Sequence, residues 1–198
     1  LWDGDINPEG LAVGLAKKLN SKVDAYINTG IFVLDENANA SDPWMYVFQP
    51  GIKVALTPDI SLNLANSIYT FVQVEGWIPP STAKSSGSNT RNGRSGLAYN
   101  FNSFTPAVEL AINEPFKQIG LKVPSFMDIP YVSIFAEYID NFSAPESNTG
   151  YAAGLKVGNA KVSGKGDWQA KYQYVMLGTN AWLDIFPDSD RYGGRTGV

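Results

Sequence analysis

The sequence predicts an all-β protein, an antiparallel up-and-down transmembrane β-barrel with about nine strands in these 198 residues. Three observations predict this fold class. Apolar and polar residues alternate with a period of two, which places them on opposite faces of a sheet. Several alternating runs reach about twelve residues, whereas soluble strands average about five to six and tilted membrane strands need about nine to eleven. Aromatic residues also gather at the ends of these runs.

The first half of the chain predicts four strands, at residues 10–19, 23–34, 44–56 and 60–75. The sequences NSK, DENANASDP and TPD connect them and are rich in turn-forming residues. The first run is rich in Ala and Leu, so propensity alone also allows a helix there, but we predict a strand. The following segment, 79–96, is rich in Ser, Gly and Asn and is interpreted as a long, mobile polar loop.

The second half predicts five strands, at residues 97–102, 107–113, 131–139, 151–157 and 167–177. The sequence SFTP joins the first two, and the long connection EPFKQIGLKVPSFMDIP precedes the third. The run at 107–113 again allows a helix by propensity, and a strand is again predicted. The last run, GDWQAKYQYVML, alternates most regularly, with Trp, Ala, Tyr and Met on one face and Asp, Gln and Lys on the other.

The connections between these strands alternate between short and long for the first six. This alternation is typical of an up-and-down barrel with tight turns at one rim and long loops at the other, whereas Greek-key sandwiches mix loop lengths. The long loops are expected outside the cell. The last two connections have middling lengths and are assigned to neither rim.

Composition excludes several classes of function. The net charge is −4 and the basic residues are scattered, so nucleic-acid binding is not expected. The chain contains no Cys and no His, which excludes thiol nucleophiles, His-based triads and the usual zinc sites. No apolar run reaches 18 residues, so a transmembrane helix is excluded while a transmembrane barrel is not. We predict that the protein is not an enzyme and needs no cofactor.

Strand alternation defines two sets of candidate functional residues. The polar set is predicted to line a wet pore, although the outer face of a soluble sheet would look the same; it comprises Lys53, Gln73, Glu75, Glu137, Lys156, Gln169, Lys171 and Gln173. The aromatic set is predicted to form girdles at the two membrane interfaces, with ordinary core packing as the alternative. It comprises Trp44, Tyr46, Trp77, Tyr131, Tyr138, Trp168 and Tyr172.

Acidic residues offer two further candidates. Alternating carboxylates in DGD and DSD loops can bind Ca²⁺, but neither loop has the closing Glu of an EF-hand, and turn formation is the more usual role; these candidates are Asp3, Asp5, Asp188 and Asp190. Glu109 and Glu137 are strand acids that could pair in glycoside hydrolysis. A position on the pore wall explains these two carboxylates equally well.

Several phrases together resemble a known family. They are WDGDINPEG (2–10), FVLDE (32–36), SDPW (41–44), GDWQAKYQY (166–174) and FPDSDRYGGRT (186–196). They resemble, in order, phrases of the bacterial putative porin family, whose members are outer-membrane β-barrels of Gram-negative bacteria. The resemblance implies passive diffusion of small hydrophilic solutes or ions through a pore, with no catalytic residues.

Family members are longer and continue into further strands, so residues 1–198 are expected to form a single barrel domain that is a fragment of a longer porin. The expected partners are the lipid bilayer, small hydrophilic solutes, and either further copies of the chain or the remaining segment of the barrel. Two other functions stay open. One is a secreted soluble β-sandwich that binds glycans through exposed aromatics, and the other is a non-conducting barrel that acts as a scaffold in an envelope complex.

Overall fold

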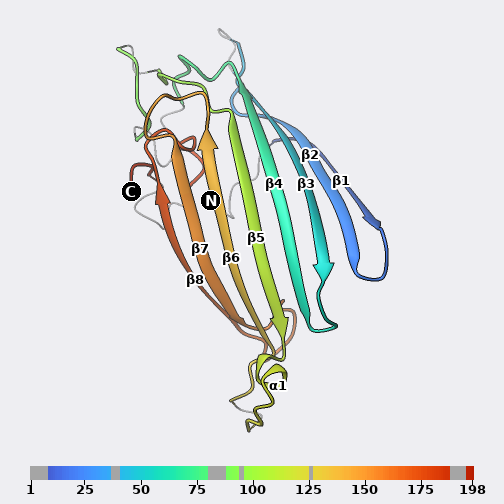
Figure 1. Cartoon of the computed structure of the whole chain (residues 1–198). Coiled ribbons are helices and arrows are strands. Elements are labelled where there is room, and N and C mark those ends of the chain that lie inside the picture. Colours follow the sequence, from blue (N-terminus) through green and yellow to red (C-terminus); the bar gives the residue numbers. More distant parts are fainter. Residues whose placement is uncertain (1–8, 37–40, 80–87, 94–95, 125–126, 188–194) are drawn as a thin grey trace.

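A computed structural model describes residues 9–36, 41–79, 88–93, 96–124, 127–187 and 195–198. They form one antiparallel sheet in which each strand pairs with its neighbours in the sequence (Figure 1). The strands are β1 Glu9–Lys18, β2 Val23–Val33, β3 Trp44–Ala55, β4 Ile60–Val72, β5 Ser103–Asn113, β6 Tyr131–Asn141, β7 Thr149–Gly158 and β8 Gln169–Leu177. The predicted all-β, up-and-down architecture is confirmed, and β1 and β8 are the two open edges of the sheet.

The number of strands is eight rather than nine. Residues 97–102 form no strand, and the predicted turn SFTP is instead the beginning of β5. Pro106 lies inside this strand and pairs with Asn66 of β4, while the pairing with β6 stops at Phe104 and resumes at Ala107. Because proline has no N–H to donate, it is tolerated where one ladder is interrupted. The prediction that SFTP is a turn between two strands was therefore wrong.

The fourth strand is shorter than predicted. It ends at Val72, because Gln73 has a φ of 61° and cannot continue the pleat. Gln73 and Glu75 consequently leave the sheet and are exposed beyond the end of β4.

The connections lie at two rims. The first rim, here called the turn rim, carries the connections β1–β2, β3–β4, β5–β6 and β7–β8, and the opposite one is called the loop rim (Figure 1). Side-chain oxygens stabilise the two tight turns: Asn20 accepts the N–H of Val23, and Thr57 accepts the N–H of Ile60. The β5–β6 connection at this rim is long and includes the short helix α1 (Pro115–Gln118). The predicted alternation of short and long connections therefore fails at the fifth connection, because SFTP is not a turn.

One face of the sheet is apolar along all eight strands, and we call it the apolar face. Every exposed large apolar side chain of the strands lies on it: Leu11, Val13, Leu15, Ile27, Tyr46, Phe48, Ile52, Leu64, Ile68, Val72, Phe104, Val108, Ile134, Tyr138, Tyr151, Leu155, Tyr172, Tyr174 and Met176. Its charged strand residues, Glu9, Lys17 and Asp140, all lie within the first or last two positions of a strand. The middle of this face therefore carries no charge.

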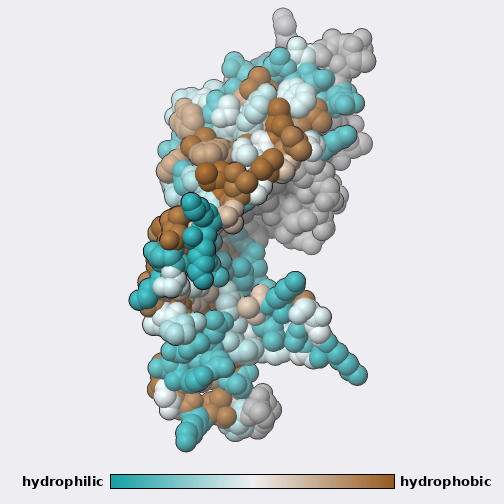
Figure 2. Space-filling model, turned by 90° about the vertical axis from the view of Figure 1, so that its right-hand side faces the viewer, coloured by the Kyte–Doolittle hydropathy of each residue, from teal (hydrophilic) through white to brown (hydrophobic). Residues whose placement is uncertain are grey.

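The opposite face, here called the polar face, divides into two zones along the strands. Near the loop rim it carries the buried hydrophobic cluster Met45, Tyr69, Phe71, Val74, Leu97, Phe101, Ile139, Leu177, Ala181, Trp182, Leu183 and Phe186. Residues 178–187, which follow β8 and are called the rim plug, cover the strands here. The Trp182 ring centroid lies 4.8 Å from that of Tyr69 and 5.8 Å from that of Phe71. Figure 2 shows the molecule hollowed on one side below the bulk of the loop rim.

Asp167 stabilises the β7–β8 connection at the turn rim. Its Oδ2 accepts the N–H of Ser163 at 3.0 Å and that of Gly164 at 2.8 Å. These hydrogen bonds favour the carboxylate and lower the pKa of Asp167 below its ordinary value of 3.8. Because the folded-state pKa is depressed, the stabilisation is fully present above the unfolded value and disappears as the pH falls through the folded one. We expect NMR titration of the Asp167 carboxyl to give a midpoint below 3.8; a midpoint at or above that value contradicts these contacts.

Candidate functional site

The polar zone below the rim plug is the candidate functional site. Side chains from different strands hydrogen-bond to one another across it. Asn28 Nδ2 donates to Gln49 Oε1 at 2.9 Å, and Gln49 Nε2 donates to Ser67 Oγ at 2.7 Å. Tyr26 OH donates to Asn63 Oδ1 at 3.0 Å. Period-two alternation places all these residues on one face, and the antiparallel register brings them within reach of one another.

Glu109 of β5 is the centre of the strongest polar cluster on this face. Its Oε1 accepts hydrogen bonds from Ser133 Oγ at 2.7 Å, Lys156 Nζ at 3.0 Å and Tyr131 OH at 3.4 Å. The Lys156–Glu109 ion pair joins β7 to β5 across β6, and both side chains stay about one-third exposed. A partly solvated pair of this kind contributes little to stability but sets the local electric field.

Phe135 lies among these charges. The ammonium groups of Lys156 and Lys171 lie 5.4 Å and 5.3 Å from the centroid of its ring, within the range of a cation–π contact. The two lysines are directly opposite each other on β7 and β8. Phe135 itself faces Gly154, whose missing side chain leaves room for the ring: a Cβ there would lie 2.7 Å from Phe135 Cζ. The same pairing recurs at Tyr26 and Gly51.

Two adjoining hollows follow this face. The first has a volume of about 250 Å³ and is lined mainly by Asn63, Glu109, Phe135, Glu137, Lys156, Lys171 and Gln173. The second, of about 450 Å³, is lined by residues that include Asp24, Tyr26, Lys53, Asn63, Glu109 and Tyr131. Asn63 and Glu109 line both hollows, which therefore adjoin, and the lining residues come from strands between β1 and β8. We call the two hollows together the polar trench.

Six of the eight residues predicted to line a pore lie on the polar face within strands: Lys53, Glu137, Lys156, Gln169, Lys171 and Gln173. Gln73 and Glu75 do not, because β4 ends before them. The prediction missed Asn63 and Phe135, although strand parity alone would have placed both on this face. The glycosidase candidates Glu109 and Glu137 both line the first hollow.

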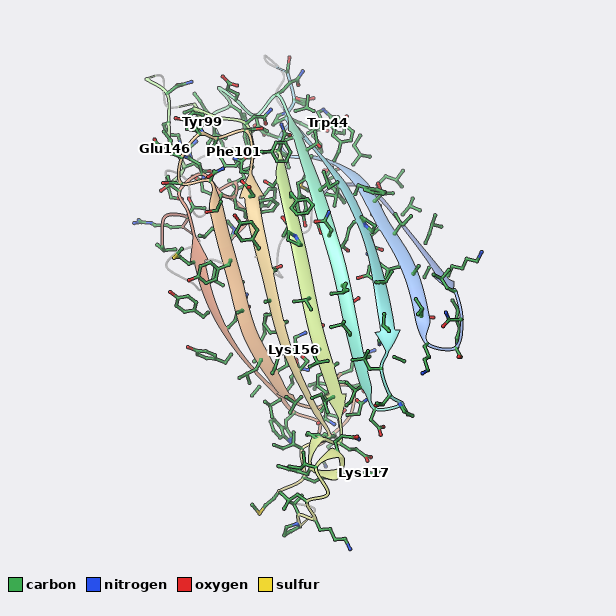
Figure 3. The ribbon with its side chains drawn as sticks, viewed as in Figure 1. Trp44, Tyr99, Phe101, Lys117, Glu146 and Lys156 are labelled. Atoms are coloured by element: carbon green, nitrogen blue, oxygen red, sulfur yellow. The ribbon has the colours of Figure 1, made fainter. Side chains whose placement is uncertain are left out.

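The residues predicted to form the aromatic girdle lie in different parts of the structure. Trp44, Tyr46, Tyr138 and Tyr172 lie on the apolar face, and the half-exposed Trp168 lies just before β8 at the turn rim. Figure 3 shows Trp44 at the loop rim and Lys156 much nearer the turn rim.

Two of the girdle residues require correction. Tyr131 lies on the polar face, where it donates to Glu109, because its parity is opposite to that of Tyr138. Trp77 lies in the connection after β4, packs against the loop-rim cluster and donates from Nε1 to Asp35 Oδ2 at 3.2 Å. Neither side chain therefore lies on the apolar face.

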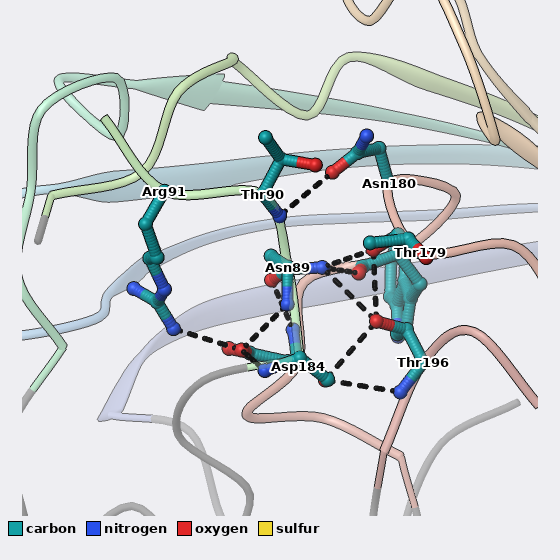
Figure 4. A network of polar contacts seen from close by, with 9 residues as sticks. Asn89, Thr90, Arg91, Thr179, Asn180, Asp184 and Thr196 are labelled. Carbon is teal, nitrogen blue, oxygen red and sulfur yellow. Dashed lines mark hydrogen bonds and ion pairs between the residues drawn. The ribbon is translucent and has the colours of Figure 1, made fainter. Parts of the chain in front are cut away.

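A buried polar network fastens the rim plug to residues 88–91 (Figure 4). Asp184 is fully buried, and its Oδ2 accepts the N–H groups of Ser88 and Asn89 and an Arg91 Nη2 hydrogen at 2.8 Å. Asn89 Nδ2 donates in return to the carbonyl oxygens of Thr179 and Trp182. Of the predicted polar loop 79–96, the structure describes residues 79, 88–93 and 96, and residues 88–91 are anchored by these bonds.

The calcium candidates Asp3, Asp5, Asp188 and Asp190 lie outside the described residues. Within the described part of the chain, no group of three or more acidic side chains is arranged to hold a metal ion. No helix among the described residues is long and apolar enough to span a membrane.

Comparisons with known proteins agree with the architecture. A family model described as "Putative porin" matches residues 1–93 and 79–198, which together span the whole chain. Searches among curated proteins and among solved structures found no match.

Proposed function

The chain belongs to the putative porin family, and from this premise we propose that it forms part of the wall of an outer-membrane channel in a Gram-negative bacterium. Small hydrophilic solutes or ions would diffuse passively along the polar trench, with lipid on the apolar face. The role is non-enzymatic: the charged side chains of the trench attract or repel solutes and perform no bond chemistry.

The apolar face carries this proposal. Exposed apolar side chains extend over eight adjacent strands, far beyond the few hundred Å² that a soluble monomer usually exposes as one patch. Strands of nine to thirteen residues match the length of about nine to eleven that a tilted membrane strand needs. Exposing these apolar side chains to water is unfavourable, whereas contact with lipid chains is not.

The two open edges of the sheet, β1 and β8, require hydrogen-bonding partners in a membrane. Unpaired N–H and C=O groups at β1 and β8 cannot stand in hydrocarbon, where each costs several kcal/mol. We therefore propose that the two edges pair with the remaining strands of a larger barrel or with another copy of the chain. The soluble β-sandwich is disfavoured, because the described residues form one sheet and supply no second sheet to cover its apolar face.

The rim plug favours one second candidate, a non-conducting barrel that serves as a scaffold. Trp182 and Phe186 pack directly on the polar face of β4, where an open pore would hold water. In a channel, this plug would be the narrowest part of the solute path. In a scaffold, it would belong to a closed interior.

Conductance across planar bilayers tests the channel. We expect detergent-solubilised protein to give discrete, ohmic current steps and to migrate differently on a denaturing gel before and after boiling, as closed β-barrels do. A barrel that inserts but passes no current would support the scaffold. A protein that stays monomeric and soluble without detergent would contradict both.

A further inference from the structure

The charges around the first hollow are segregated by strand. Both carboxylates, Glu109 and Glu137, come from β5 and β6, and both ammonium groups, Lys156 and Lys171, come from β7 and β8. Register fixes this arrangement: Lys156 and Lys171 are directly opposite each other, and Glu109 is opposite Phe135. The hollow therefore has an acidic edge and a basic edge, which meet at the Glu109–Lys156 ion pair, and the Phe135 ring lies beside the two lysines.

Its dimensions suit a small solute. The volume is about 250 Å³. The 3.0 Å contact between Glu109 and Lys156 shows that groups on the two edges come close enough for one short molecule to reach both. These two side chains stay partly exposed, so a solute in the trench can compete for their hydrogen bonds.

From this arrangement we infer that the hollow is a binding site for small zwitterions, molecules that carry an ammonium and a carboxylate on a short carbon chain. The ammonium would lie toward Glu109 and Glu137, the carboxylate toward Lys156 and Lys171, and the carbon chain near the edge of Phe135. An ion of one sign is attracted by one edge and repelled by the other, whereas an aligned zwitterion gains at both. This inference rests on the proposed function, since it names the solute class that the same polar face would favour.

Saturation-transfer NMR on the whole chain in detergent micelles tests the inference, because it detects weak binding without requiring conductance. The probes are 4-aminobutanoate, butanoate and butylammonium, with protein-free micelles as the blank. We expect the zwitterion to give an effect about threefold or more above either single-charge analogue, as partly screened ion pairs allow. Equal effects for the three probes, or none for any of them, would overturn the inference.

Variants that remove charges should change the charge of the preferred probe, an effect that general unfolding would not produce. The double substitution Glu109→Gln with Glu137→Gln should shift the preference to butanoate, and Lys156→Gln with Lys171→Gln should shift it to butylammonium. Lys22→Gln, in the exposed β1–β2 turn, removes one charge far from the hollow and should leave the preference for the zwitterion unchanged. An order of probes that stays the same in both double variants would also overturn the inference.

Conductance measured on the same preparations separates this inference from the proposed function. A preference for the zwitterion without current would support the binding site and contradict the channel. Current without a preference for the zwitterion would support the channel and contradict the binding site.

Discussion

Ile134→Lys is expected to destabilise the bilayer-folded protein, lowering its free energy of unfolding by about 2 to 3 kcal/mol. Ile134 lies on the apolar face of β6, opposite Leu110 and Leu155, with 60% of its surface exposed. A lysine on the lipid face of a membrane strand costs about 2–4 kcal/mol at the bilayer midplane and less toward the interfaces. Ile134 lies two residues from the midpoint of β6, which places the expected cost in the lower part of that range.

The measurement is reversible urea titration of folding into phospholipid vesicles. Gln173→Lys is the matched control, because it adds the same side chain to the polar face at the midpoint of β8 and should change the free energy by less than about 0.5 kcal/mol. In a soluble protein the expectation differs, since an exposed Ile→Lys change is nearly neutral. Equal, small effects of both substitutions would therefore contradict a lipid-facing apolar face.

Trp182→Ala is expected to loosen the rim plug and to raise channel conductance. Trp182 is 1% exposed and contacts the rings of Tyr69, Phe71 and Phe186. Truncating a buried tryptophan removes transfer free energy and leaves a cavity, at a cost of about 3–5 kcal/mol. The strands are held by their own ladders, so this loss should fall mainly on residues 178–187 and their bonds to residues 88–91.

Hydrogen exchange of the amides of residues 178–187 would show faster exchange in this variant, and single-channel recording would show larger steps. Trp168→Ala is the control, because that side chain is 48% exposed at the turn rim and far from the plug. It should leave both the exchange of these amides and the conductance unchanged. Faster exchange with unaltered conductance would indicate that the rim plug does not limit the solute path.

How far the sequence predicted the fold depended on the kind of signal. Long alternating runs located β1, β2, β3, β6, β7 and β8 to within about two residues, because side-chain parity is local and is imposed by the pleat itself. The errors arose at SFTP and at Gln73. Proline at 106 reads as a break in isolation, yet it is tolerated because the ladder to β6 is interrupted there. The left-handed φ of Gln73, which ends β4, has no marker in the local pattern.

The candidate site shows the same division. Residue parity along the strands was sufficient to assign Lys53, Glu137, Lys156, Lys171 and Gln173 to a polar face. It did not place Tyr131 beside Glu109, because that contact depends on the register between β5 and β6, which residue type does not encode.

Periodicity and residue type act over a few neighbours, so they were enough to predict a sheet of long strands with one apolar and one polar face. Which residues meet follows from the tertiary structure. Register set Lys156 opposite Lys171 and Phe135 over Gly154, and chain return after β8 brought Trp182 onto Tyr69 and Asp184 onto Arg91. Contacts between segments distant in the chain depend on the shape and packing of the whole sheet, which no local pattern encodes.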